Sequence, residues 1–469
     1  MLYHSKAENN KLMMGGNYYG QKTRIIFRQN GLCTCCCRLC SRSWESLEVS
    51  LSGSKIWWRD LSASLFNTGC HIWFHSYDHR IAIGRKTGVS AIGAFQKLDK
   101  RFGFVGVLAC IVPFIITPYY CVIGGWVIKY LFTFLTGKVS AAAGDEFFTG
   151  FISESVSPVV WFAIFILLTS AIVIFGVEKG VEKASRFMMP LLIVLIVGVC
   201  IFCITRPGAA EGVKYYLLPD FSKFSATTVL AAMGQLFYSM SLAMGIMITY
   251  GSYMKKDSHL EASVRQIELF DTAIAFLAGL LIVPSVFVFS GGDEAALGKG
   301  PSLMFITLPK VFNDMTLGGV IGAVFFLLVL FAALTSSISL METNVSILRD
   351  KFGWSRKKST LIITVYVLIL GSIVSLGFGP LSFIKILGLG LLDFFDFISN
   401  SVLMPIVAIL TCICVGHFVG AKVISDEVEL NAPFKMKKFY TIMLKWIAPV
   451  FLVLVLAFAV SEAMGWIRV

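Results

Sequence analysis

The sequence is poor in charged residues. Asp, Glu, Lys and Arg make up only 14% of its 469 residues, whereas a soluble protein of this length has about 25%. By contrast, 57% of the residues are hydrophobic and 40 are Phe. Apolar runs of about 20 residues recur along the chain, and each is long enough to cross about 30 Å of hydrocarbon. These features exclude an ordinary soluble protein and predict an all-α polytopic membrane protein, not an enzyme.

Two other signals are missing. The residues that follow Met1 contain no apolar segment of the kind that a cleavable signal peptide requires, so we expect none. The net charge of +12 is not accompanied by the pattern of basic and aromatic residues typical of nucleic-acid binding. Basic residues in cytoplasmic loops, which fix the orientation of a membrane protein, explain the charge instead.

Nine membrane spans are predicted after Phe102. They cover residues 103–134, 158–176, 187–205, 226–253, 265–290, 317–347, 360–376, 387–418 and 440–466. Lys and Arg concentrate in alternate loops, and the loops between them carry "AAAGDEF", "PGAAEG" and "SGGDEAALG". The positive-inside rule therefore predicts a cytoplasmic N-terminus and an external C-terminus in the cell inner (plasma) membrane.

The stretch "MGQLFYSMSLAMGIMITYGSY", residues 233–253, lies in the predicted span at 226–253 and has polar and small residues near its midpoint, including Tyr238, Ser239, Ser241 and Gly245. A helix that breaks at such a point exposes backbone carbonyls to an ion. The alternative is ordinary helix packing through small residues.

A second polar cluster lies in "FAALTSSISLMETN", residues 331–344. Thr335, Ser336 and Ser337 are consecutive hydroxyls, and Ala332 precedes them by one turn. Hydroxyls and a free carbonyl make a hard-oxygen site suited to an alkali cation. The alternative is that each hydroxyl bonds back to the preceding helical turn.

Carboxylates mark two further spans. Asp271 stands at the start of one, where it is either a cation ligand or an interfacial residue. Asp393 and Asp396, in "GLLDFFDFISNS", are either gate residues or a solvated cap. Tyr119 and Tyr120 follow a proline in "PFIITPYYCVIGGW", which predicts an irregular, functional segment.

Taken together, these stretches resemble the neurotransmitter:sodium symporter family, in its bacterial amino-acid branch. The resemblance covers residues 81–469 and rests on the order and spacing of "EKGVEKASRFMMP", "GQLFYSMSLAMGIMITYGSY", "LFDTAIAFLAGLLIVP" and "FAALTSSISLMETN". It implies eleven spans, the first ten arranged as two inverted repeats of five, with substrate and ions held at broken helices. It also implies sodium-coupled symport of an amino acid by alternating access.

The family's first span, which reads approximately AAAGSAVGLGNLWRFPYLAGKNGGG, is missing. Residues 31–60 instead read "GLCTCCCRLCSRSWESLEVSLSGSKIWWRD". When degenerate codons are read one nucleotide later, Trp44, Trp57 and Trp58 become glycines, and residues 44–60 permit GNLWRFPYLAAKFGGGT. Residues 33–43 permit VLAAAGSAVGL, and residues 61–80 permit an apolar second span that ends in glutamate. We therefore expect two regions: residues 1–80, with frameshifted spans 1 and 2, and a transporter domain at residues 81–469 with spans 3–11.

The competing interpretation of the cysteines at residues 33–40 is a zinc or disulfide site. Structural zinc is bound by separated pairs of ligands, and a C-x-C-C-C cluster does not close one tetrahedron. A cytoplasmic position also disfavours disulfides.

The resemblance assigns roles to residues that match the family's motifs. Ser239 and Asp271 match ligands of one sodium ion, and Ala332, Thr335 and Ser336 match ligands of a second. Tyr120 matches the residue that binds the substrate carboxylate, and Asp396 matches an outer gate. The residues that match the side-chain pocket are Ile116, Tyr238, Ser241, Met244, Ser337 and Leu340.

The expected partners are a small, apolar or aromatic amino acid, co-transported Na+ and the lipid bilayer, and the expected state is a monomer or weak dimer. Chloride is not required in this interpretation. Chloride-independent relatives carry a glutamate where this chain has Ala275, and Asp271 supplies a negative charge instead. Two alternatives stay open: a proton- or other cation-coupled amino-acid permease of the same architecture, and a non-transporting membrane binding protein. With its N-terminal region as written, the chain is expected to be impaired.

Overall fold

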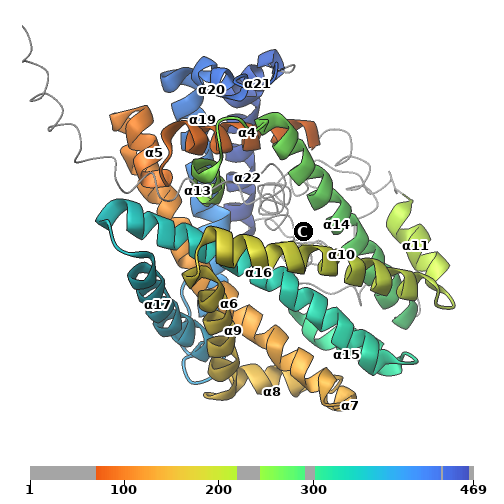
Figure 1. Cartoon of the computed structure of the whole chain (residues 1–469). Helices are drawn as coiled ribbons and strands as arrows, with labels where there is room; N and C mark the ends of the chain where they lie inside the picture. Colours follow the sequence, from red (N-terminus) through yellow and green to blue (C-terminus); the bar gives the residue numbers. More distant parts are fainter. Residues whose placement is uncertain (1–69, 219–242, 291–300, 435–436, 464–469) are drawn as a thin grey trace, which may run out of the picture.

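The computed structural model describes residues 70–218, 243–290, 301–434 and 437–463. Within these residues the chain is helical, with one isolated bridge between Ile386 and Leu389 and no strand (Figure 1). Eight helical stretches of the described chain are long and apolar enough to cross a membrane: Lys100–Leu135, Ser157–Ile174, Val177–Ile204, Leu260–Phe289, Gly318–Phe352, Arg356–Leu376, Leu391–Val428 and Lys437–Ser461. The predicted all-α polytopic fold is confirmed.

Most predicted spans coincide with one long helix. These helices are α6 (Gly103–Leu135), α9 (Ser157–Ile174), α10 (Lys183–Ile204), α14 (Leu260–Phe289), α16 (Gly318–Phe352), α17 (Arg356–Leu376) and α22 (Ala448–Ala463). The predicted span at 387–418 is built from shorter pieces instead, α18 (Leu391–Asp396) and α19 (Met404–Ile413), joined by a π-helical segment at Phe397–Leu403. Such π-helical turns are frequent at functional sites.

The predicted irregular segment around Tyr119 and Tyr120 is wrong, because α6 is continuous through Pro113 and Pro118. A proline inside a helix leaves the carbonyl four residues earlier without its usual partner. For Pro118 that carbonyl belongs to Phe114, and the hydroxyl of Tyr366 on α17 donates to it at 3.1 Å. A neighbouring helix thus satisfies the freed group, which is how membrane helices tolerate proline.

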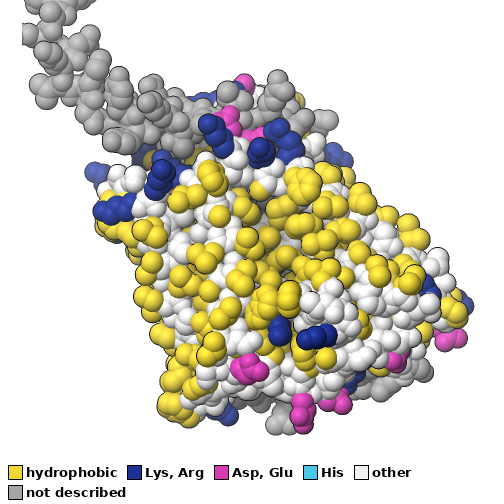
Figure 2. All heavy atoms as spheres, turned by 60° about the horizontal axis from the view of Figure 1, so that its bottom comes forward, with side chains coloured by type: hydrophobic (Ala, Val, Ile, Leu, Met, Phe, Trp, Pro, Cys, Tyr) yellow, Lys and Arg dark blue, Asp and Glu magenta, His cyan; other side chains and the backbone are white. Residues whose placement is uncertain are grey.

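The two ends of the helical bundle differ in charge. Helices α5 (Ala91–Leu98), α20 (Ala421–Val428) and α21 (Lys437–Ile442) lie at one end, and α7 (Val139–Ala142), α8 (Phe147–Ser153) and α15 (Leu308–Asp314) lie at the other (Figure 1). On the face seen in Figure 2, Lys and Arg gather mainly along one edge and Asp and Glu mainly along the opposite edge, with a broad apolar surface between them. This distribution suits a bilayer-spanning protein, and the orientation given by the positive-inside rule stays a prediction.

Two glycines let helices α4 (Cys70–Thr87) and α13 (Ile246–Tyr253) pack backbone to backbone. A Cβ atom on Gly84 would lie 2.0 Å from the carbonyl oxygen of Ile248, and one on Gly251 would lie 2.3 Å from that of Ile81. Contact this close is possible only without a side chain. The first turns of α13 therefore pack directly against α4. The predicted boundary between the two regions of the chain, at residue 80, falls inside α4.

A buried ion pair joins α4 to the basic end of the molecule. Arg85 Nε donates to Glu427 Oε1 of α20 at 2.9 Å, and Arg85 Nη1 donates to the carbonyl oxygen of Ser258 at 2.9 Å. The side chains of Arg85 and Glu427 are 0% and 6% exposed. The arginine therefore holds the loop before α14 and helix α20 together.

Candidate functional site

The chain departs from helical geometry immediately before α13. Ala243 and Gly245 have φ angles of 73° and 69°, and α13 begins at Ile246. Met244, between them, is completely buried. The predicted span at 226–253 is therefore not one continuous helix, and the first amides of α13 have no partner within their own helix. This turn provides the kind of helix end that binds a carboxylate.

Three oxygen atoms converge on the buried middle of α16. Thr335 Oγ1 donates to the carbonyl oxygen of Ala332 at 2.8 Å, and Ser336 Oγ donates to the same oxygen at 3.2 Å. Both hydroxyl side chains are 0% exposed. Back-bonding of hydroxyls to the preceding turn is thus present, and it also gathers three hard oxygen atoms at one point. An alkali cation is bound by such atoms.

The predicted substrate-pocket residues of the described chain lie in the packed interior. Ile116, Tyr120, Met244 and Leu340 are each at most 3% exposed, and they come from α6, α16 and the turn before α13. Ser337 is buried as well, but its hydroxyl lies 2.7 Å from Thr169 Oγ1 of α9. In this structure the hydroxyl of Ser337 is therefore hydrogen-bonded toward α9.

Hydrogen bonds from Asn344 join helices α6 and α16. Asn344 Nδ2 donates to Thr117 Oγ1 at 2.9 Å and to the carbonyl oxygen of Pro113 at 3.3 Å. All three residues are buried. Because each unpaired polar group is costly in hydrocarbon, this contact sets how the pocket residues of α6 face α16.

Asp271 lies inside α14, away from either end of this helix, and it is half-buried. A position inside the helix does not locate the membrane boundary, so both interpretations of Asp271, a cation ligand and an interfacial residue, stay predictions. Tyr238, Ser239 and Ser241, the other residues assigned to the substrate and to the first sodium ion, lie outside the described residues.

The predicted gate residue Asp396 sits in a hydrogen-bonded group. Tyr119 Oη donates to Asp396 Oδ1 at 3.1 Å, and Asn400 Nδ2 donates to the same oxygen at 2.6 Å. Ser399 Oγ lies 3.4 Å from the Tyr119 hydroxyl. Tyr119 and Tyr120 are neighbours on α6, so their side chains point about 100° apart. Tyr119 faces the Asp396 group, and Tyr120 faces a different direction.

Sequence reasoning missed a buried carboxylate in α16. Glu342 is 0% exposed, forms an ion pair with Arg356 and accepts a hydrogen bond from Tyr253 at 2.9 Å. Arg356 Nε also donates to the carbonyl oxygen of Val173 at 2.9 Å. The signal was present in the sequence, because an acid within an apolar span points to a functional or paired residue by default.

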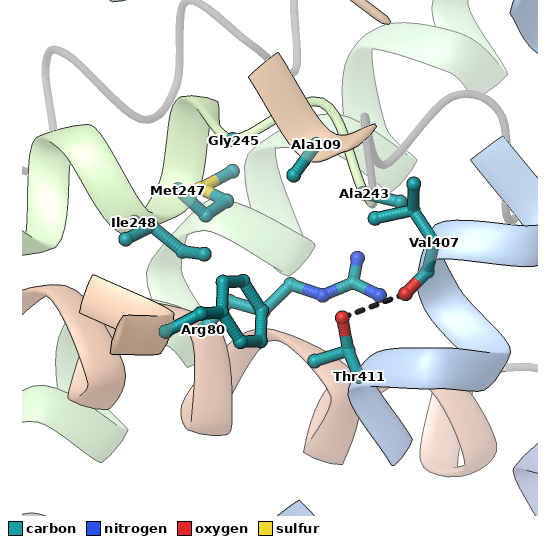
Figure 3. Close-up of a pocket in the computed structure, with 9 residues that line it drawn as sticks. Arg80, Ala109, Ala243, Gly245, Met247, Ile248, Val407 and Thr411 are labelled. Carbon is teal, nitrogen blue, oxygen red and sulfur yellow. Dashed lines mark hydrogen bonds between the residues drawn. The ribbon is translucent and has the colours of Figure 1, made fainter. Parts of the chain in front are cut away.

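A cavity lies beside the turn that precedes α13 (Figure 3). Its wall includes Ala243, Gly245 and Val407, and the guanidinium of Arg80 extends toward Val407 and Thr411. Arg80 is only 3% exposed. A buried guanidinium is tolerated only where polar groups accept its hydrogen bonds, so Arg80 marks a polar point in this interior.

Among the residues that the structure describes, no three His, Cys, Asp or Glu side chains are grouped so as to hold a metal ion. The cysteines at residues 33–40 lie outside the described residues. The oxygen cluster of α16 is of a different kind, since it consists of hydroxyls and a carbonyl.

Comparison with known proteins gives a consistent result. The model of the sodium:neurotransmitter symporter family matches residues 148–465. An uncharacterized sodium-dependent transporter of Bacillus subtilis, YhdH, is 32% identical, with 79% of this chain and 83% of the relative covered. A sodium-dependent serotonin transporter of Drosophila melanogaster is 23% identical, with 81% and 67% covered. The crystal structure of MhsT in complex with L-phenylalanine superposes with a TM-score of 0.82 at 32% identity, and covers 92% of this chain and 99% of MhsT.

Proposed function

The chain belongs to the sodium:neurotransmitter symporter family, and we propose that it carries a small apolar or aromatic amino acid into the cell together with sodium. Like these relatives, the chain is a multi-pass, sodium-dependent transporter. The amino-acid substrate is supported by the similarity to MhsT, which was crystallised with L-phenylalanine. The observation that carries the proposal is the convergence of Thr335 and Ser336 on the Ala332 carbonyl.

In this proposal, the three oxygen atoms on α16 are ligands of one co-transported sodium ion. The Thr335 and Ser336 hydroxyls can each turn their hydrogen away and present a lone pair, since a hydroxyl rotates to suit its partner. The Ala332 carbonyl has two lone pairs, and it keeps one available. Asp271 on α14, together with Ser239, supplies the second sodium site.

The substrate is held beside the turn before α13. The amides at the start of α13 and the hydroxyl of Tyr120 bind its carboxylate, because helix N-termini favour anions. Its side chain contacts the apolar residues Ile116, Met244 and Leu340, with Tyr238, Ser241 and Ser337 completing the pocket. The buried, mostly apolar lining favours an apolar or aromatic side chain.

Two polar groups close the pathway at opposite ends of the site. Asp396, bound by Tyr119, is the outer gate carboxylate. The ion pair between Glu342 and Arg356 lies toward the basic end of α16, and Tyr253 connects it to α13. Sodium favours the state that binds substrate from outside, and the gradient then drives one helix bundle to rock against the other.

The N-terminal region is proposed to be a frameshifted form of the family's first two spans. It rests on the glycines that the shifted reading frame gives at Trp44, Trp57 and Trp58, and on the glutamate that it permits at Arg80. Sequencing the DNA of codons 25–85 tests it, because these codons read one nucleotide later should encode the glycine-rich first span, whether the shift is a sequencing error or a real change in the gene. A shifted frame that does not encode this span would contradict the frameshift without affecting the family assignment.

Transport by the frame-restored protein tests the function. Cells that express it should take up labelled L-phenylalanine in sodium medium and not in choline medium. Uptake that persists in choline and collapses with a proton ionophore would favour the proton-coupled alternative. Saturable binding without uptake would favour a binding protein. Both outcomes would contradict sodium symport.

A further inference from the structure

Lys129 places a positive charge inside the membrane helix α6. Its ammonium group lies over three aromatic rings, 5.9 Å from the centroid of Phe147, 5.6 Å from that of Phe151 and 5.8 Å from that of Trp161. The first two rings belong to α8 and the third to α9. No carboxylate of the described chain lies within ion-pairing distance of this ammonium group.

The depth of Lys129 follows from the length of α6. This helix has 33 residues, so it is about 50 Å long, whereas the hydrocarbon core is about 30 Å thick. Lys129 precedes the last residue, Leu135, by about 9 Å along the axis. It therefore lies close to the boundary between hydrocarbon and headgroups, at the end opposite Lys100 and Arg101.

The rings of Phe147, Phe151 and Trp161 form an aromatic cage around Lys129. An exposed apolar stripe runs along α9 beside this cage. Val160, Ile164 and Leu168 are 49%, 37% and 44% exposed, and their spacing of four residues puts them on one face of the helix. Phe132 of α6 is 51% exposed and packs on Trp161 with ring centroids 5.3 Å apart. An acyl chain that begins near Lys129 can continue along this stripe into the bilayer.

We propose that Lys129 binds the phosphodiester group of a membrane phospholipid, whose acyl chain lies on the Val160–Ile164–Leu168 stripe. The aromatic rings attract the ammonium through their faces but accept no strong hydrogen bond from it. An ammonium has three donors, and the phosphate is the anion that a bilayer supplies at this depth. The rings position the charge, and the lipid satisfies the donors. This site is separate from the transport site and does not depend on the proposed substrate.

The test uses the purified full chain, with native mass spectrometry while dioleoylphosphatidylglycerol is titrated in. Lys129→Gln should weaken retention of the first lipid by about tenfold, and Lys129→Arg should retain it. Lys138→Gln is the matched control, since Lys138 is exposed just beyond the same helix, and this change should have no effect.

Three results would overturn the proposal. Equal lipid retention by Lys129→Gln and the unaltered chain, with lower thermal stability of the variant, would make the cage a purely structural contact between α6, α8 and α9. Displacement of the lipid by millimolar inorganic phosphate would make it a site for free anions. A phospholipid with a photoreactive acyl chain, added to the unaltered chain, should label α9 at the stripe, and labelling confined to other helices would also contradict it.

Discussion

Tyr253 and Glu342 are joined by a 2.9 Å hydrogen bond between the tyrosine hydroxyl and Oε1 of a completely buried carboxylate. Arg356 forms an ion pair with the other oxygen, Oε2. Helices α13, α16 and α17 are therefore joined through the Glu342 carboxylate. Because α13 begins at the turn beside the proposed substrate site, this contact links that turn to the basic end of the bundle.

Replacing the shared carboxylate should destabilise the protein. Glu342→Gln leaves the guanidinium of Arg356 buried without its anion, and the expected loss is about 3 kcal/mol in the free energy of unfolding. The measurement is thermal unfolding of the detergent-solubilised, frame-restored protein. Glu182→Gln is the control, because Glu182 pairs with an exposed arginine, Arg186, and such pairs contribute at most about 1 kcal/mol. Equal losses of stability in the two variants would show that the Glu342–Arg356 pair contributes no more than an exposed ion pair.

The glycine contact between α4 and α13 predicts a large effect of one methyl group. Gly251→Ala puts a Cβ atom 2.3 Å from the Ile81 carbonyl oxygen, so the helices must separate. We expect lower folded yield and loss of uptake by the frame-restored protein. Gly198→Ala in α10 is the matched control, since nothing lies within 4 Å of that position, and Ala is the better helix former. Normal folding and uptake of Gly251→Ala would contradict the packing.

The α16 oxygen cluster predicts a specific loss of sodium dependence. In the frame-restored protein, Thr335→Val combined with Ser336→Ala removes two of three proposed ligands, and sodium-dependent uptake should fall to background. Ser372→Ala on α17 is the control: that hydroxyl also bonds back to its own helix, at 2.7 Å, but lies outside the site. Uptake with unaltered sodium dependence in the double variant would contradict the assignment of Thr335 and Ser336 as sodium ligands.

Chloride replacement tests the role of Asp271. If its carboxylate supplies the negative charge beside the first sodium ion, uptake should be unchanged when gluconate replaces chloride. The readout is initial uptake rate at constant sodium. A rate that falls to background in gluconate would show that chloride is required.

Much of the fold followed from the sequence. Long apolar runs located α6, α14 and α16, because a bilayer requires helices of that length. The turn before α13 was signalled by small and polar residues within a span, and Gly245 indeed has a positive φ angle. For Thr335 and Ser336 the structure shows the back-bonding to the preceding turn that was given as the alternative, and their role as sodium ligands stays a prediction.

Other features depended on contacts between distant helices. Proline next to Tyr119 predicted an irregular segment, but Tyr366 satisfies the freed Phe114 carbonyl and α6 stays helical. The partner of Glu342 lies on a different helix, and the cage around Lys129 combines residues of α6, α8 and α9. A single-sequence pattern contains no information about such cross-helix pairs.

The most direct test of the account is concentrative uptake by proteoliposomes that contain the frame-restored protein. Labelled L-phenylalanine is supplied outside with sodium, and the inside is held at −100 mV. One sodium ion that crosses this potential provides about 2.3 kcal/mol, which corresponds to about 50-fold accumulation. The account predicts accumulation of at least about this size with sodium and none with choline. Accumulation that is the same in choline, or its absence in both media, would contradict sodium-coupled amino-acid symport.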